Sequence, residues 1–364
     1  KEKRTLEDFK KINYDHTKAN KKAVFYYSIF FPVVELIGAV SGALIIWYGG
    51  GEAIKGALTI GILISFIQYS EMFFRPIRDL SEKYNIMQTA MASSERIFKL
   101  LDRQAVIRDP EQPIPLNDCK GNIEFKNVSF AYIKQDYVLK YISFNIRQGE
   151  KVAFVGATGA GKSSIMNLLC RFYDAQIGEI TVDGINIKDI KQSELRKNIG
   201  LVVQDIFLFS DSISNNISLN NNSIPVSRIK EAASIIGIDH FISKLPLGYG
   251  QNVKERGVTL SQGERQLITF ARALAYDPKI LILDEATSSV DTHSEILIQN
   301  AIDKLMDGRT SIIMAHRLST IQKCDKIIVM HKGEIRETGT HQQLLELGGI
   351  YSRLYQLQYK DSFV

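Results

Sequence analysis

The chain has 364 residues, of which 45% are apolar and 23% are charged, and its formal net charge is +5. These ordinary fractions exclude a disordered chain, a collagen-like repeat and a small disulfide-stabilised domain, and the length favours about two domains. The basic excess gathers at the start, where residues 1–22 contain eight Lys or Arg and four Asp or Glu. Residues 122–364 are almost balanced, so we expect no nucleic acid partner.

Two long apolar segments follow this basic start. Residues 24–51 contain one charged side chain, Glu35, and residues 56–74 contain only Glu71. At about 1.5 Å of helix per residue, the first segment covers ~40 Å and exceeds the ~30 Å hydrocarbon core of a membrane. We therefore predict membrane spans at about residues 24–48 and 56–74. The alternative is a pair of buried helices in a soluble protein.

Positive charges flank the two segments and predict their orientation. Lys21 and Lys22 precede the first segment, and Arg75 and Arg78 follow the second. Because Lys and Arg favour the cytoplasmic side, we expect a multi-pass protein of the cell membrane with both ends of this hairpin in the cytoplasm. Glu35 would then line a substrate path inside the membrane or lie at its wet inner edge, and both interpretations stay open.

The polar part of the chain begins after the second segment. Residues 76–102 keep a helical spacing of apolar side chains, which predicts a cytoplasmic continuation of the second span. Three prolines within residues 109–115 then interrupt helical structure. We expect part of a membrane domain at residues 1–108, a linker at 109–121 and a second domain at 122–360.

A glycine-rich segment, GATGAGKSS, occupies residues 156–164. It follows an apolar strand predicted at Lys151–Val155 and precedes a helical pattern at Ile165–Phe172, which is the context of a phosphate-binding P-loop. The loop N–H groups and the helix N-terminus would hold phosphate oxygens. Lys162 would reach the β- and γ-phosphates and Ser163 would coordinate a metal ion, so ATP and Mg²⁺ are the expected cofactors.

Two carboxylates end a second apolar strand. In the sequence KILILDEA, residues 279–286, Asp284 and Glu285 follow four apolar residues. The carboxyl ends of parallel strands face the ligand in an α/β sheet, so Asp284 suits Mg²⁺ coordination through water and Glu285 suits a general base. His316 follows a strand predicted at Thr310–Met314, a position suited to contact the γ-phosphate. The alternative for the acidic pair is a solvated turn.

The segment LSQGERQ, residues 260–266, lies between the P-loop and the acidic strand. It resembles the Leu-Ser-Gly-Gly-Gln signature of ATP-binding cassette (ABC) proteins, and the order of the three motifs is similar to that of the same family. The resemblance implies an α-helical transmembrane hairpin with cytoplasmic helical extensions, followed by an α/β P-loop NTPase of ABC type with a helical subdomain and an antiparallel β subdomain. The whole chain looks like an N-terminally truncated exporter half-transporter.

The resemblance also implies roles for single residues. Tyr132 would stack on adenine, Gln204 would link Mg²⁺ and water to the membrane domain, and Asp291 would belong to the D-loop. The implied catalytic residues are Glu285, His316 and Gln204, and the implied Mg²⁺ ligands are Ser163, Gln204 and, through water, Asp284. The residues expected to bind ATP are Tyr132, Gly156, Ala157, Thr158, Gly159, Ala160, Gly161, Lys162, Ser163 and Ser164.

ABC cassettes work as head-to-tail dimers, which implies that Ser261, Gln262, Gly263 and Glu264 act on the ATP of a second half-transporter. Gln262 replaces a glycine of the signature and Glu264 replaces its glutamine. A carboxylate near a triphosphate adds repulsion unless it is paired or points away. We therefore favour a heterodimer, in which the altered signature faces a degenerate site, over a homodimer that tolerates the variant.

The favoured function is ATP hydrolysis that drives export of a substrate across a membrane. The alternatives are a homodimeric lipid flippase, a peptide exporter, and a soluble ABC ATPase that transports nothing. The two apolar segments oppose the soluble alternative. The cassette motifs do not identify the transported substrate.

Overall fold

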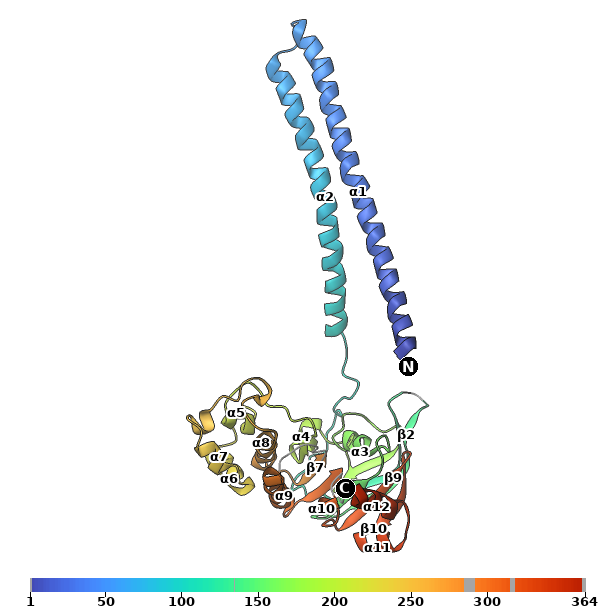
Figure 1. The fold of residues 1–364 in the computed structure, drawn as a ribbon, viewed down its shortest axis with the longest axis vertical. Helices are drawn as coiled ribbons and strands as arrows, with labels where there is room; N and C mark the ends of the chain where they lie inside the picture. Colours follow the sequence, from blue (N-terminus) through green and yellow to red (C-terminus); the bar gives the residue numbers. More distant parts are fainter. Residues whose placement is uncertain (1, 134, 285–291, 315–317, 362–364) are drawn as a thin grey trace. The chain divides into compact units, whose positions relative to one another are not determined.

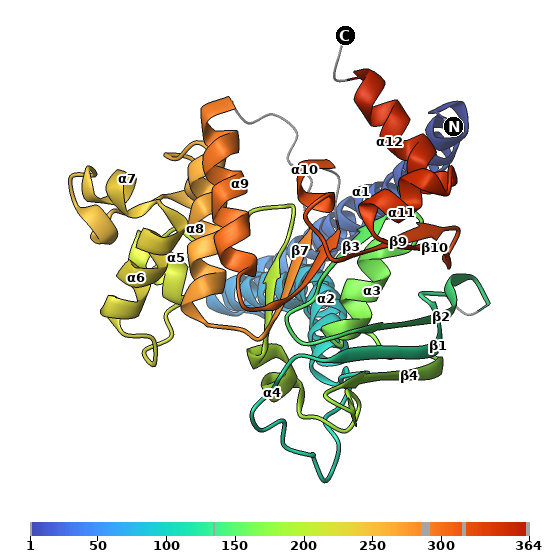
Figure 2. The ribbon, with the colours of Figure 1, turned by 90° about the horizontal axis from the view of Figure 1, so that it is seen from below.

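The computed structural model divides the chain into two compact units, Lys1–Gln104 and Ala105–Val364 (Figure 1; Figure 2). The first unit is helical, and the second combines two sheets with surrounding helices, as the sequence predicted. Each unit is described separately below. The structure describes residues 2–133, 135–284, 292–314 and 318–361.

Two long helices make up the first unit, α1 at Glu2–Ile54 and α2 at Ile60–Leu101. They run antiparallel as a hairpin (Figure 1). A side chain at Gly49 of α1 would collide with Leu63 of α2, because the position of its Cβ lies 2.7 Å from the Leu63 Cδ1. The two helices therefore approach closely where a glycine removes the side chain.

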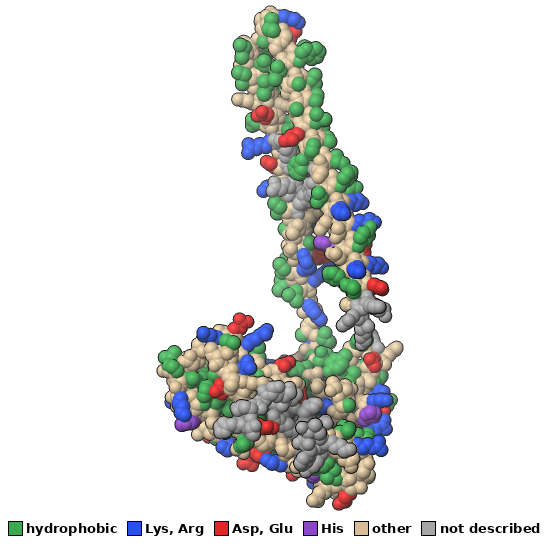
Figure 3. All heavy atoms as spheres, in the orientation of Figure 1, with side chains coloured by type: hydrophobic (Ala, Val, Ile, Leu, Met, Phe, Trp, Pro, Cys, Tyr) green, Lys and Arg blue, Asp and Glu red, His purple; other side chains and the backbone are tan. Residues whose placement is uncertain are grey.

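Helix α1 is long and apolar enough to cross a membrane, and among the residues that the structure describes it is the one helix that meets both criteria. Its apolar side chains are exposed, Trp47 to 79%, and hydrophobic side chains cover much of the hairpin (Figure 3). The second span predicted at 56–74 starts before its helix does, because residues 56–59 form the turn and Gly56 has a φ of +76°. Apolar surface of this extent needs lipid or other helices around it.

A hollow of about 750 Å³ lies between the two helices of the hairpin. Its lining includes polar side chains from both helices, with Glu35 from α1 and Gln68, Glu71 and Arg75 from α2. The sequence did not decide whether Glu35 lines a path inside the membrane or lies at its inner edge. The structure places this carboxylate in the hollow that Glu71 also lines.

Two sheets form the framework of the second unit. A four-stranded antiparallel sheet has the order β2-β1-β4-β5, and a six-stranded sheet has the order β10-β9-β3-β8-β7-β6, in which only β10 is antiparallel to its neighbour. The strands are β1 (Ile123–Ala131), β2 (Tyr137–Ile146), β3 (Lys151–Val155), β4 (Ile177–Val182), β5 (Ile185–Asn186), β6 (Ile199–Val202), β7 (Ile280–Asp284), β8 (Thr310–Met314), β9 (Lys326–His331) and β10 (Glu334–Gly339).

Helices α5 to α9 gather on one side of the mixed sheet, away from β1, β2 and β4, and form the helical subdomain (Figure 2). The helices of the second unit are α3 (Lys162–Leu169), α4 (Gln192–Lys197), α5 (Ile213–Ser218), α6 (Val226–Ile236), α7 (Asp239–Ser243), α8 (Gln262–Ala275), α9 (Thr292–Met306), α10 (Leu318–Ile321), α11 (His341–Glu346) and α12 (Ile350–Asp361), with 3-10 turns η1 (Gly248–Gly250) and η2 (Glu255–Gly257).

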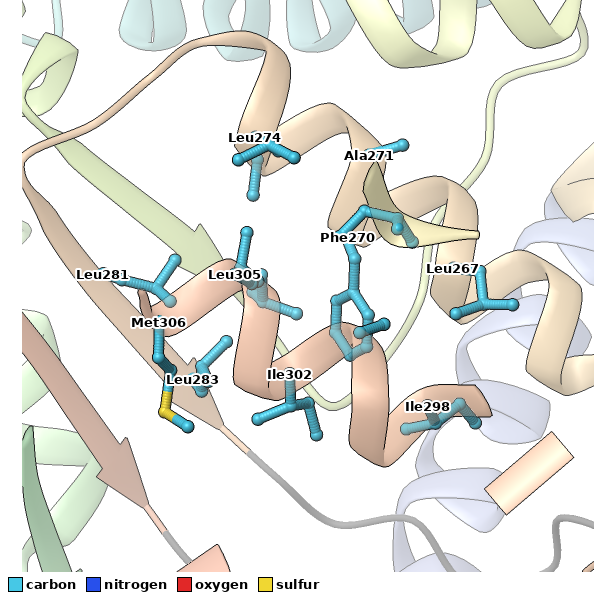
Figure 4. Packing of buried hydrophobic residues seen from close by; sticks show 14 of the residues in the cluster. Leu267, Phe270, Ala271, Leu274, Leu281, Leu283, Ile298, Ile302, Leu305 and Met306 are labelled. Carbon is cyan, nitrogen blue, oxygen red and sulfur yellow. The ribbon is translucent and has the colours of Figure 1, made fainter. Parts of the chain in front are cut away.

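Two buried clusters hold these layers together. The first surrounds β1, β2, β3 and α3 and contains Phe125, Phe154 and Ile165. The second joins α8 and α9 to β7, and in Figure 4 Phe270 points from α8 toward Ile302 of α9. Full burial of a Phe side chain contributes about 1.5–3 kcal/mol. This packing fixes α8 against the end of the mixed sheet.

Within the second unit, the segment before β1 is hydrogen-bonded to the residues around α3 and α4. The backbone N–H of Gln192 donates to the Asp109 carboxylate over 2.8 Å, which lowers the pKa of Asp109. Arg171 follows α3 and is only 3% exposed, and its guanidinium donates to the carbonyls of Arg108 and Ile190, both at 2.9 Å. Arg108 and Asp109, where the predicted linker begins, are therefore bonded to the residue Arg171 after α3 and to the first residue of α4.

Replacing Arg171 by Met should loosen this attachment. The change removes a charged donor and leaves two carbonyls without their partner, at a cost of about 3 kcal/mol. Hydrogen exchange should become faster at the amides of Ile114 and Leu116, which are bonded to Asp189 and Glu194. Exchange at wild-type rates in Arg171→Met would contradict the attachment.

Candidate functional site

The parallel strands of the mixed sheet end at a common edge. Phe154 of β3 and Asp284 of β7 both pair with Met314 of β8, so these three strands finish side by side. The next strand, β6, ends at Val202, two residues before Gln204. Because loops that leave the carboxyl ends of neighbouring parallel strands share one edge, the P-loop, the acidic strand end and Gln204 come together from distant parts of the sequence.

The loop between β3 and α3 has room only for glycine at two positions. A side chain at Gly156 would collide with the carbonyl of Met330, and the Cβ of a residue at position 161 would lie 2.7 Å from the Leu139 Cδ2. Gly161 also has a φ of +105°, which side chains disfavour. These glycines bend the loop so that Ala157 and its two successors stay exposed above α3.

Lys162 begins α3 and points back into the loop. Its Nζ donates to the carbonyls of Gly156 and Ala157, at 2.5 and 3.3 Å, and the residue is only 8% exposed. Burial lowers the pKa of Lys162, and the nearby Asp284 carboxylate opposes that shift. The exposed loop, the start of a helix and an ammonium group form a cradle that fits an anion with several oxygens.

Tyr132 lies beside this cradle. Its hydroxyl is 3.2 Å from the Ser164 hydroxyl and accepts a hydrogen bond from the Asn167 amide over 2.9 Å. The ring meets Phe130 and Tyr173 edge-on, with centroids 4.7 and 5.0 Å away, and remains 46% exposed. A partly exposed, positioned aromatic face next to a phosphate site suits stacking of a flat base.

Gln204 and Asp284 line one small cavity of about 20 Å³. Gln262 and Gln266 from the first two turns of α8 line the same cavity. Sequence reasoning missed Gln266, although a signal was present. Gln266 precedes Phe270 by four residues, so it is a polar residue on the buried face of an otherwise apolar helix stripe.

The altered signature has a local explanation at the N-terminus of α8. The Ser261 hydroxyl accepts from the Glu264 N–H over 3.2 Å, and the Glu264 carboxylate accepts from the Ser261 N–H over 2.7 Å. This reciprocal pair is a capping box, and a negative charge is favourable at a helix N-terminus. The Glu264 carboxylate therefore bonds within its own helix, although it keeps its negative charge.

The signature residue Ser261 forms its hydrogen bonds at the start of α8 and not with the described residues of this chain's own P-loop. Among the residues that the structure describes, Ser261 bonds only within α8. Gln262 is exposed and Gly263 is buried. Three further predicted residues, Glu285, Asp291 and His316, lie outside the described residues, and their roles stay predictions.

Comparisons with known proteins agree with this architecture. A family model described as "ABC transporter" matches residues 139–288, and one described as "ABC transporter transmembrane region" matches residues 1–77. YknV of Bacillus subtilis (strain 168), an uncharacterized ABC transporter ATP-binding protein, is 44% identical over 354 residues, which are 97% of this chain and 59% of YknV.

Two further similarities extend the comparison. An ATP-dependent lipid A-core flippase of Syntrophus aciditrophicus is 43% identical, over 94% of this chain and 57% of the flippase. Among solved structures, a bacterial Atm1-family ABC exporter with ATP bound matches with a TM-score of 0.70 at 37% identity, over 90% of this chain and 56% of that chain. The chain thus spans a little more than half the length of these proteins.

The capping box predicts how substitutions at Glu264 behave. Glu264→Ala removes the side chain that bonds the Ser261 N–H and should destabilise the start of α8 by about 1 kcal/mol. Glu264→Gln keeps an acceptor of the same length and should cost less than half as much. Thermal unfolding of the two variants against wild type measures the difference, and equal losses would argue against the capping box.

Proposed function

The chain belongs to the ABC transporter family, and we propose that it forms one half of a dimeric exporter in which ATP hydrolysis drives a substrate across a membrane. The main support is that one chain contains both a phosphate-binding site and a long apolar hairpin. The carboxyl edge of the mixed sheet carries a P-loop cradle next to an acidic strand end, and the other unit exposes a long apolar hairpin.

In this proposal the P-loop residues hold the phosphates of ATP. The backbone N–H groups from Ala157 to Ser163 and the Lys162 ammonium group offer hydrogen bonds to β- and γ-phosphate oxygens. Tyr132 stacks on the adenine from one side. The Ser163 hydroxyl, the Gln204 amide oxygen and, through water, Asp284 would hold Mg²⁺, which supplies charge neutralisation on the phosphates when bound.

Hydrolysis needs residues that follow the described strands. We propose Glu285 as the general base that takes a proton from the attacking water, because it follows Asp284 directly at the carboxyl edge. His316 follows β8, the neighbour of both β3 and β7, and would contact the γ-phosphate. Asp291 would belong to the segment that meets the second subunit.

The second subunit completes the site. Ser261 and Gly263 would donate hydrogen bonds to the γ-phosphate held by the P-loop of the partner. Glu264 bonds within its own helix, which weakens its support for a degenerate partner site. Gln262 adds a side chain where the family signature has glycine. We therefore base the more specific proposal, a heterodimer and not a homodimer, on Gln262.

A lipid-like substrate is the second, more specific candidate. It is favoured by the 43% identity to a protein named as a lipid A-core flippase. The hairpin hollow that contains Glu35 and Glu71 offers polar groups beside apolar walls, which suits an amphipathic molecule. In this proposal the hairpin lies in the cell membrane and the second unit lies in the cytoplasm.

Two substitutions separate nucleotide binding from hydrolysis. Lys162→Ala should weaken ATP binding about a hundredfold, the equivalent of about 3 kcal/mol of charge-assisted hydrogen bonding. Glu285→Gln should bind ATP as wild type does and hydrolyse it at least about a hundredfold more slowly. Both are measured on the reconstituted protein by nucleotide titration and phosphate release. Unchanged turnover in Glu285→Gln would refute the assigned base.

The heterodimer is tested by purifying the protein without any other ABC subunit. If Gln262 needs a complementary partner, ATP turnover of the protein alone should be weak and should rise after Gln262→Gly. Robust cooperative turnover of the unmodified protein alone would instead establish the homodimer. Retention of the protein in membranes washed with alkaline carbonate serves as the control for membrane insertion.

A further inference from the structure

Gln266 on α8 is a buried polar residue whose side-chain oxygen has no hydrogen-bond partner among the described residues. The residue is 7% exposed, and within the described parts of the chain its Oε1 is fully buried with no hydrogen-bond partner. Buried acceptors in folded proteins are almost always bonded, and an exception points to strain, catalysis or an unseen partner. Gln266 is flanked along α8 by Leu267 and Phe270, which pack in the apolar cluster of Figure 4.

The cavity beside Gln266 shows where a partner fits. Gln266 lines the cavity of about 20 Å³ that Gln204, Gln262 and Asp284 also line. The Gln204 side chain carries the amide N–H groups that can donate into this cavity. A residue of α8 with an acceptor that is unbonded within the described ranges and a residue of the loop after β6 with amide donors therefore line the same small cavity.

We propose that Gln266 is a positioning residue that sets Gln204 relative to Asp284. In the ATP-bound protein its Oε1 accepts a hydrogen bond from the Gln204 amide, a contact that this structure does not contain. This bond turns the Gln204 oxygen toward the side of Asp284, where the proposed Mg²⁺ ligands meet. The inference rests on the proposed function, because it assigns Gln204 to the metal and water of ATP hydrolysis.

The position of Gln266 on α8 connects this bond to the nucleotide site of the second subunit. Gln266 lies little more than one turn after Ser261, which would face the nucleotide of the second subunit. Helix α8 is held as a rigid body by Phe270, Leu274 and their contacts with α9 and β7 (Figure 4). In this proposal, Ser261 at the partner's ATP and Gln266 beside Gln204 are connected through the same helix, α8.

The test replaces Gln266 by Met in the reconstituted full-length protein. Gln266→Met keeps the length of the side chain and removes the strong acceptor. The KM for ATP should stay within twofold, kcat should fall about tenfold, and the Mg²⁺ concentration for half-maximal turnover should rise about threefold. Without nucleotide the unfolding temperature should stay equal or rise, because in that state the buried acceptor that the change removes is unbonded within the described chain.

Two matched variants complete the experiment. Gln266→Glu keeps an acceptor at the same length and should retain kcat within about threefold of wild type. Thr269→Val removes a second buried polar group of α8, whose hydroxyl donates to the Arg265 carbonyl, and should change neither kcat nor the Mg²⁺ dependence.

Wild-type kcat and Mg²⁺ dependence in Gln266→Met would overturn the inference while leaving the proposed function intact. Equal losses in the Met and Glu variants with a lowered unfolding temperature would also overturn it, since they indicate a structural role. Absence of ATP turnover in the wild-type protein would overturn the proposed function, and this inference with it.

Discussion

The site depends on the register of four neighbouring parallel strands. The pairing of β3, β8, β7 and β6 brings their carboxyl ends to one edge, although these strands lie more than 160 residues apart at the extremes. A one-residue slip in any pair would move a loop by about 3.3 Å along the strand direction relative to its neighbours, which exceeds the tolerance of a hydrogen bond. The buried apolar clusters on both faces of the sheet hold this register, so packing far from the loops positions the cradle.

Helix α8 connects this edge to the rest of the assembly. Its apolar stripe packs on α9 and β7, its capped N-terminus presents the signature, and its polar exception, Gln266, faces the loop of Gln204. At the opposite end of the P-loop helix, Arg171 ties α3 to the segment that leads from the hairpin. The second unit therefore has separate physical connections from the nucleotide cradle to the signature and to the segment that precedes β1.

Short motifs in the sequence predicted the strand–loop–helix around Lys162 and the strand that ends at Asp284, because local spacing determines both. The pattern Ser-x-x-Glu at Ser261 is also local, and the structure shows that Glu264 completes a capping box there. The bond from Gln192 to Asp109 joins residues 83 positions apart, and the burial of Gln266 depends on three other elements. Contacts of this kind follow from tertiary packing. Local periodicity places Gln266 on the buried face of α8 but does not show which residues lie beside it.

The most direct measurement is a cryo-electron microscopy structure of the full-length protein with its partner subunit, trapped with ATP and Mg²⁺. The account predicts the β- and γ-phosphates against the N–H groups of residues 157–163, Lys162 on a phosphate oxygen, and Ser261 of the same chain at the nucleotide of the partner. ATP bound away from the P-loop, or held by the P-loop and signature of one chain, would contradict it.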